Sequence, residues 1–174
     1  VLDEFPIGQS PEGLYIMKGK VYVCNTGFNP IDFSYGQGTV AVFDPQLDTV
    51  IAVINVGKNP QALKRDYQGE LNVVCTGDYG AVEGAVYVIN PNTNIVTDSI
   101  LIGGTPANIA IAWDGTAFLS AGGFVGNGLV YTFNSKTNTI LRGKNNPLLV
   151  DLGTTDVAVD KSGICYVACF SAST

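Results

Sequence analysis

Ile7-Gly8-Gln9-Ser10-Pro11 begins a segment that this chain repeats. The opening returns as Val56-Gly57-Lys58-Asn59-Pro60, as Ile102-Gly103-Gly104-Thr105-Pro106 and, in a weaker form, as Leu152-Gly153-Thr154-Thr155. Successive openings begin 46 to 50 residues apart. A regular period of this length indicates one supersecondary unit used several times, and it defines which segments of the chain are equivalent.

Each repeat is predicted to form four short strands, here called A to D. A turn containing glycine, such as Lys18-Gly19-Lys20, joins A to B, and Asp44-Pro45 and Asn90-Pro91 begin the turn from C to D. The predicted strands are 13–17, 62–66, 108–113 and 156–160 for A; 21–25, 71–75, 117–121 and 165–169 for B; 39–44, 85–90 and 129–134 for C; and 50–56, 95–102 and 139–152 for D. No stretch has a sustained helical period.

Four-stranded units with this period predict an all-β fold, a β-propeller built from four-stranded antiparallel blades. The predicted blades are 7–55, 56–101, 102–151 and an incomplete 152–174. Propellers close with about four to eight blades. We therefore expect these blades to belong to a ring of roughly seven, completed by the remainder of a longer chain or by a second copy.

Further motifs resemble the YVTN β-propeller repeat. Tyr22-Val23-Cys24-Asn25 matches the signature tetrapeptide except that Cys replaces Thr, and residues 38–44 and 84–90 match its strand C. The resemblance covers nearly the whole chain and departs from the pattern at 72–75, 118–121 and 166–169. It implies an extracytoplasmic location, secreted or on the cell surface as in surface-layer proteins, and a role in binding or scaffolding.

Composition excludes several classes of function. The chain contains no histidine, which removes Ser-His-Asp and Cys-His catalysis and His-ligated metals or haem. Its net charge of −6, without a basic patch, disfavours nucleic-acid binding. No apolar run reaches the roughly 18–20 residues of a membrane-spanning helix. No cofactor is expected.

The four cysteines lie in apolar runs and are interpreted as buried free thiols that pack as small apolar side chains. They are Cys24, Cys75, Cys165 and Cys169. Cys165 and Cys169 lie too far apart along one strand for a disulfide. Cys24 and Cys75 are one step out of register in successive blades, so we expect them to face opposite ways. No CxxC spacing supports a metal site.

Strand direction places the long B–C loops and the D–A connections on one face of a propeller. The B–C loops are predicted at 26–38, 76–84 and 122–128, and long loops on a rigid scaffold are common binding sites. The candidate ligand-binding residues are the aromatic and acidic side chains of these loops: Phe28, Asp32, Phe33, Tyr35, Asp78, Tyr79, Glu83 and Phe124. Aromatic rings beside carboxylates suit a protein or carbohydrate partner. The alternative is that the rings pack under their own loops.

Acidic side chains on this face could also supply oxygen ligands to calcium, but no D-x-D-x-D-G loop is present. The residues concerned are Asp32, Asp78, Glu83 and Asp156. We therefore expect solvated carboxylates and no metal site.

One inner strand differs from its equivalents. Leu63-Lys64-Arg65-Asp66 occupies the place of Leu14-Tyr15-Ile16-Met17 and Ile109-Ala110-Ile111-Ala112. Strand A lines the central channel of a propeller, so Lys64 and Asp66, expected on one strand face, are candidate channel-lining residues that could hold an anion or small ligand. Solvated charges are the alternative. The tract 142–147 is predicted to interrupt the last strand of the third blade as a bulge or edge loop.

Three functions remain compatible with the sequence. The first is a non-enzymatic binding or scaffolding propeller that acts through its long-loop face. The second is an enzyme-type propeller, lactonase-like or quinoprotein-like, with carboxylates and a metal in the channel, for which Asp66 and Asp156 are candidates. The third is a structural surface subunit that assembles with copies of itself.

Overall fold

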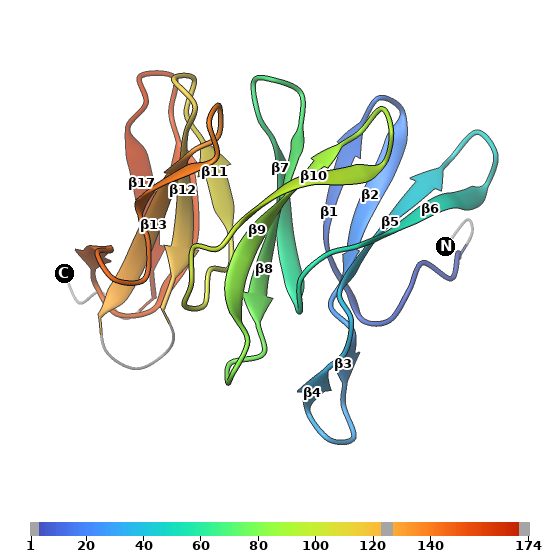
Figure 1. The fold of residues 1–174 in the computed structure, drawn as a ribbon, viewed down its shortest axis with the longest axis horizontal. Helices are drawn as coiled ribbons and strands as arrows, with labels where there is room; N and C mark the ends of the chain where they lie inside the picture. The colour runs from blue at the N-terminus through green and yellow to red at the C-terminus, as the bar shows by residue number, and fades with distance from the viewer. Residues whose placement is uncertain (1–3, 123–126, 171–174) are drawn as a thin grey trace.

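A computed structural model describes residues 4–122 and 127–170 and shows antiparallel sheets that follow one another along the chain. Figure 1 shows the sheets standing side by side, from the first repeat on one side of the molecule to the fourth repeat on the other. The predicted partial β-propeller is therefore confirmed. The described residues contain no helix, and so none that could span a bilayer.

The first blade has the strand order β1-β2-β5-β6, and the second has β7-β8-β9-β10. The first consists of β1 (Pro11–Met17), β2 (Lys20–Asn25), β5 (Thr39–Asp44) and β6 (Thr49–Asn55). The second consists of β7 (Pro60–Arg65), β8 (Leu71–Gly77), β9 (Glu83–Asn90) and β10 (Ile95–Ile100). The inner strand of the second blade thus ends one residue earlier than predicted, because Asp66 belongs to the turn.

The third blade is irregular at its outer edge, as its sequence predicts. Its inner strands are β11 (Ile109–Ile111), β12 (Thr116–Ala121) and β13 (Gly128–Asn134). The outer strand is split into β14 (Thr139–Arg142) and β15 (Leu148–Val150), both of which pair with β13. The last sheet is the two-stranded pair β16 (Thr154–Val159) and β17 (Cys165–Cys169).

The repeated openings are explained by the bonds that they make to the end of strand B. The carbonyl of Ser10 accepts the amide hydrogen of Thr26 at 3.0 Å, and the carbonyl of Asn59 accepts that of Thr76 at 2.9 Å. Ser10 and Asn59 have φ values of 52° and 56°. In these two openings, a residue in the left-handed region turns the chain back so that strand A can pair with strand B of the same blade.

The inner strands β1, β7, β11 and β16 lie beside one another in chain order, as strands that line a central channel must. The approach of the first two is close. A side chain at Gly13 of β1 would bring its Cβ to 2.2 Å from the carbonyl oxygen of Gln61, so this position requires glycine.

The hydrophobic cores lie between blades. The cluster between the first and second blades contains Tyr22 and Val40 from one and Leu63 and Val73 from the other. A second cluster joins the next pair of blades, and a third, smaller cluster joins the third blade to β16–β17. We call the face of a blade toward the preceding blade its back face, and the opposite face its forward face.

One back-face position shows how this packing repeats. Leu63, Ile109 and Val157 are each paired with the equivalent residue of strand B, and their side chains are 7%, 5% and 6% exposed. Leu14 holds the same place in the first blade but is 62% exposed. The back face of the first blade thus has the pattern of a packing surface. Phe5 covers only its outer part, with its ring 4.7 Å from that of Phe43.

All four cysteines are free, but the prediction that all four are buried is wrong for two of them. Cys24 and Cys75 are buried and share the cluster between the first two blades. Cys24 lies on the forward face of the first blade and Cys75 on the back face of the second. These two faces pack against each other, so the predicted opposite orientations place both thiols in the same interface. Cys165 and Cys169 lie with Val167 on the back face of β17 and are half-buried, because β17 is the outer strand of a two-stranded sheet and no further strand flanks it among the described residues.

Candidate functional site

The first B–C loop forms a hairpin of its own. β3 (Phe28–Asn29) pairs with β4 (Ser34–Tyr35), and Figure 1 shows this hairpin projecting beyond the first blade. At its tip, one carboxylate oxygen of Asp32 accepts hydrogen bonds from the Ser34 hydroxyl at 2.6 Å and the Ser34 amide at 3.0 Å. These two bonds, the hydroxyl first, lower the pKa of Asp32 from its ordinary value.

The second B–C loop is organised around Asp78. Its carboxylate accepts the amide hydrogens of Val82 at 2.8 Å and Gly80 at 3.0 Å, and it pairs with the ammonium group of Lys58 at 3.1 Å. The Val82 amide is the main cause that lowers the pKa of Asp78, with Lys58 adding to it. Lys58 belongs to a repeat opening, which is a D–A connection. D–A connections and B–C loops were expected on the same face, and this explains why Lys58 lies beside the second B–C loop. The sequence reasoning nevertheless missed it.

These two loops bring four of the predicted aromatic residues together: Phe28, Phe33, Tyr35 and Tyr79, which we call the aromatic cluster. The ring centroid of Phe28 lies 6.0 Å from that of Phe33 and 5.2 Å from that of Tyr35. Tyr35 lies 6.0 Å from Tyr79 of the next blade. The cluster therefore bridges two blades.

The aromatic cluster is exposed at its tips and half-buried at its base. Phe33 is 76% exposed and Tyr79 64% exposed, whereas Phe28 and Tyr35 are half-buried. Both exposed residues have a positive φ, 57° for Phe33 and 58° for Tyr79. Ile31, which is 89% exposed in the same hairpin as Phe33, was not among the predicted residues. Bulky residues held in this strained region are often associated with function.

Two predicted residues lie outside the aromatic cluster. Glu83 forms an ion pair with Lys144, so its carboxylate is directed toward the interrupted edge of the third blade. Phe124 falls outside the described residues. Lys144, like Lys58, is a cation that the sequence reasoning did not connect to this face.

The four acidic residues considered for calcium are not assembled into one group. Asp32 and Asp78 each organise their own loop, Glu83 pairs with Lys144, and Asp156 accepts the side-chain amide of Asn108 at 2.6 Å. Across residues 4–122 and 127–170, no cluster of three acidic or cysteine side chains has an arrangement that could hold a metal ion.

The predicted channel-lining residues occupy two different environments. Lys64 is exposed, and so is Arg65, which departs from strict alternation along β7. Asp66 is buried, with one carboxylate oxygen accepting the amide hydrogens of Gln68 and Glu70, both at 2.9 Å. Its other oxygen accepts the side-chain amide of Asn72 at 3.1 Å. The Asp66 carboxylate thus holds the turn between β7 and β8.

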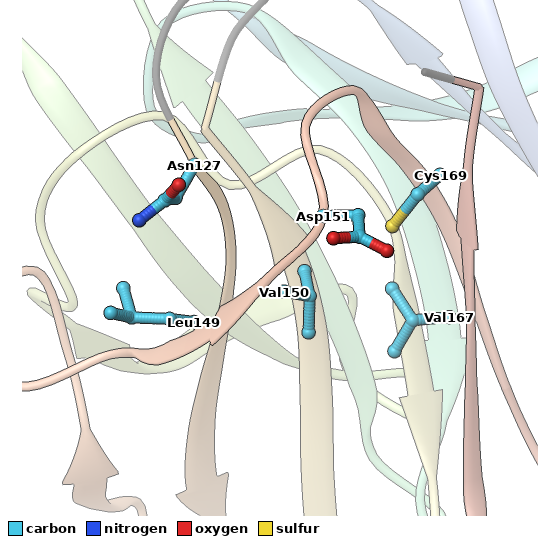
Figure 2. A pocket seen from close by; sticks show the side chains of 6 residues that line it. All are labelled: Asn127, Leu149, Val150, Asp151, Val167 and Cys169. Atoms are coloured by element: carbon cyan, nitrogen blue, oxygen red, sulfur yellow. The ribbon is translucent and has the colours of Figure 1, made fainter. Parts of the chain in front are cut away.

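A further cavity, of about 600 Å³, lies between the third blade and β17. Figure 2 shows its lining: Asn127, then Leu149 and Val150 of β15, Asp151 just beyond them, and Val167 and Cys169 of β17. It adjoins the end of the third B–C loop. The sequence analysis did not predict it, because its wall depends on how β15 and β17, which belong to different sheets, are placed relative to each other.

Comparison of sequences identifies no relative: no protein-family model matches the chain, and neither does any curated protein sequence. The structure, in contrast, resembles solved β-propellers. Hydrazine synthase from Kuenenia stuttgartiensis superimposes with a TM-score of 0.69 at 22% identity, over 88% of this chain and 41% of that one.

Two further similar structures are the WD40 domain of Neurospora crassa Pan2 and the Dos1 propeller. The first has a TM-score of 0.55 at 12% identity, over 86% of this chain and 42% of that one. The second has a TM-score of 0.61 at 15% identity, over 92% of this chain and 42% of that one. The chain thus spans less than half the length of these three neighbours. At these identities the likeness shows the fold alone.

Proposed function

We propose that this chain is a binding propeller of the YVTN type that holds a protein partner on its long-loop face, outside the cytoplasm. The observation that carries the proposal is the aromatic cluster, which spans two blades and exposes Phe33 and Tyr79. Large apolar side chains exposed together favour a protein or ligand contact. The location rests on the resemblance to secreted and surface-layer propellers.

A protein partner suits this surface better than a carbohydrate. The most exposed apolar residue of the hairpin that carries Phe33 is aliphatic, Ile31. Aliphatic and aromatic side chains together form the desolvated centre of protein interfaces, whereas sugar sites combine ring faces with a dense set of polar groups. Carbohydrate binding is the alternative result of the experiment.

The test compares proteins that differ only in exposed aromatic side chains. The double variant Phe33→Ala/Tyr79→Ala removes the tips of the aromatic cluster, and Tyr67→Ala removes a ring of similar exposure, 62%, from the opposite, A–B turn side. Photocrosslinkers placed at position 31 in each protein are activated on intact cells of the source organism. One protein crosslinked by the wild type and by Tyr67→Ala, but not by the double variant, is the expected result.

Other results overturn this proposal or redirect it. Crosslinking that the double variant retains would show that the side chains of Phe33 and Tyr79 do not hold the partner. Binding to a glycan array that the double variant abolishes, without a crosslinked protein, would establish the carbohydrate alternative. Fractionation of the source cells tests the location separately, and recovery of the protein only in the cytoplasm would contradict it.

The proposal also includes a further blade that covers the exposed back face of the first blade. Leu14 is exposed where its equivalents are covered, Ile16 is exposed on the same face, and Tyr166 is exposed on the forward face of β16–β17. These are the two kinds of face that pack together in the three clusters described above. We expect another blade to cover each, supplied by further repeats or by a second copy. Sedimentation of the 174-residue chain distinguishes a lone monomer from an assembly of copies.

A further inference from the structure

Two adjoining cavities open at the inner edge of the first three blades, on the side of the A–B turns. One, of about 420 Å³, is lined by Tyr15, Lys64, Arg65, Asp66, Tyr67 and Ile111. The other, of about 360 Å³, is lined by Tyr15, Ile16, Met17, Lys18 and Arg65. They share the side chains of Tyr15 and Arg65, so they form one site with two compartments, here called the channel-mouth site.

Positive charge is concentrated at the channel-mouth site although the chain carries a net charge of −6. Lys64 and Arg65 line the first compartment, and Arg65 and Lys18 line the second. Within the described part of the chain, ion pairs are formed by other lysines, and neither Lys64 nor Arg65 has a carboxylate partner. Lys18 donates to the side-chain oxygen of Asn92, which is neutral.

The single carboxylate in the wall forms no ion pair with these cations. Asp66 is buried, and its two oxygens are taken up by the amides of Gln68, Glu70 and Asn72. The bonds fix the turn that follows β7 and leave the side chains of Lys64 and Arg65 exposed. A cavity wall with adjacent unpaired cations attracts anions, because a ligand can supply the missing counter-charge.

Lys64 and Arg65 are specific to the second blade. The positions equivalent to Lys64 and Arg65 are Tyr15 and Ile16 in the first blade and Ala110 and Ile111 in the third. Packing between blades does not require charged residues at these positions, since the equivalent strands have uncharged residues there. Tyr15 and Tyr67 add aromatic walls, and Tyr67 is 62% exposed.

We propose that the channel-mouth site binds a small organic polyanion, with two or more separated carboxylate or phosphate groups. Arg65 contacts the ligand from both compartments, Lys64 holds one anionic group, and Lys18 holds the other. Guanidinium and ammonium groups bind both kinds of anion. Tyr15 and Tyr67 pack against the ligand's carbon skeleton. This site lies on the side opposite to the aromatic cluster, so it does not depend on the proposed partner.

Isothermal titration calorimetry at low ionic strength tests this site with citrate and inorganic pyrophosphate as probes and acetate as the monovalent control. We expect at least one polyanion to bind and acetate not to bind. The variant Lys64→Ala/Arg65→Ala should weaken that binding at least about tenfold, as expected when two charge-assisted contacts are lost. Arg142→Ala, which removes an exposed cation on an outer strand, should leave it within about twofold.

The probes separate the two ligand chemistries. Binding of citrate alone indicates a polycarboxylate ligand, and binding of pyrophosphate alone a phosphorylated one; either result supports the site. Binding of neither overturns it, and so does an equal loss in Arg142→Ala, which would indicate unspecific attraction. The variant Lys64→Gln/Arg65→Gln, checked for an unchanged thermal midpoint, must reproduce the loss; normal binding by this folded variant would overturn the assignment.

Discussion

The ring of Tyr35 lies 6.0 Å from the ring of Tyr79, at an interplanar angle of 55°, although the two residues belong to loops of different blades. Tyr35 is half-buried beneath this contact, whereas Tyr79 is exposed above it. Neighbouring blades are therefore joined at the long-loop face as well as through their cores. A partner that contacts Tyr79 touches a surface whose shape depends on both loops.

The first prediction concerns the energy of this contact. In a double-mutant cycle with Tyr35→Leu and Tyr79→Leu, we expect a coupling energy of about 0.5–1.5 kcal/mol, the usual value for an aromatic pair. Urea unfolding of the four proteins measures it. A coupling energy indistinguishable from zero would show that the rings do not interact in solution.

The second prediction uses the repeat as its own control. Leu63→Ala should lower the free energy of unfolding by about 2–5 kcal/mol, because it opens a cavity in the cluster between the first two blades. Leu14→Ala, at the equivalent but exposed position, should cost less than about 1 kcal/mol in the monomeric chain. Equal costs in a protein shown to be monomeric would contradict the packing described here.

The third prediction concerns the turn held by Asp66. Asp66→Ala leaves two backbone amides and the side-chain amide of Asn72 without their acceptor. We expect a loss of about 1–3 kcal/mol of stability. Asp66→Asn keeps one acceptor oxygen and should lose less. Thermal unfolding checks both variants, and an Asp66→Ala protein as stable as the wild type would refute the assigned role.

The fourth prediction concerns pH. The pKa of Asp78 is lowered in the folded state, first by the Val82 amide and also by Lys58. A lowered pKa means that the stabilising contribution is complete above the unfolded-state pKa and is lost as pH falls through the folded-state pKa. The second B–C loop should therefore remain ordered at neutral pH and loosen only in acid.

Carboxyl NMR titration measures this pKa directly, and we expect it below the ordinary aspartate value of 3.8. Lys58→Met serves as the control that keeps the Val82 bond and removes the charge, so the pKa of Asp78 should rise partway. A pKa at or above the ordinary value in the wild type would show that these hydrogen bonds are absent in solution.

The fifth prediction concerns thiol reactivity. Burial raises the pKa of Cys75 to about 12 and raises that of Cys24 well above its ordinary value. Alkylation at pH 8 should therefore modify Cys165 and Cys169 in the native protein, and the other two only after unfolding. Peptide mapping by mass spectrometry identifies the modified residues. Rapid labelling of Cys24 or Cys75 would mean that the first two blades separate readily.

The strand pattern was predictable because it depends on local signals. The Gly-x-x-Pro openings, the turns with glycine and the Asp-Pro and Asn-Pro steps recur at one period, and each has a conformational cause. The split outer strand of the third blade was also foreseen from the polar tract at 142–147. These features depend on residues that are close together in the sequence, so they can be predicted without knowing which blades are in contact.

The sequence predicted less well those side-chain contacts and degrees of burial that depend on how neighbouring blades pack. It named Phe28, Phe33, Tyr35 and Tyr79 as candidates, but the approach of Tyr35 to Tyr79 follows from how two blades are set beside each other. The pairing of Glu83 with Lys144 has the same origin. The half-buried state of Cys165 was missed because burial also depends on a flanking strand, which β17 lacks on its outer side among the described residues.

The placement of the cores between blades has a consequence for how the molecule unfolds. Each cluster belongs equally to two sheets, so no blade can lose its structure without uncovering the next one, as in other repeat architectures. Opening should start at the sheets covered on one side only, and amide hydrogen exchange should be slowest in β8, every residue of which is buried. The second blade, which packs against a blade on each of its two faces, is therefore expected to hold the first and third blades in position until the whole molecule unfolds.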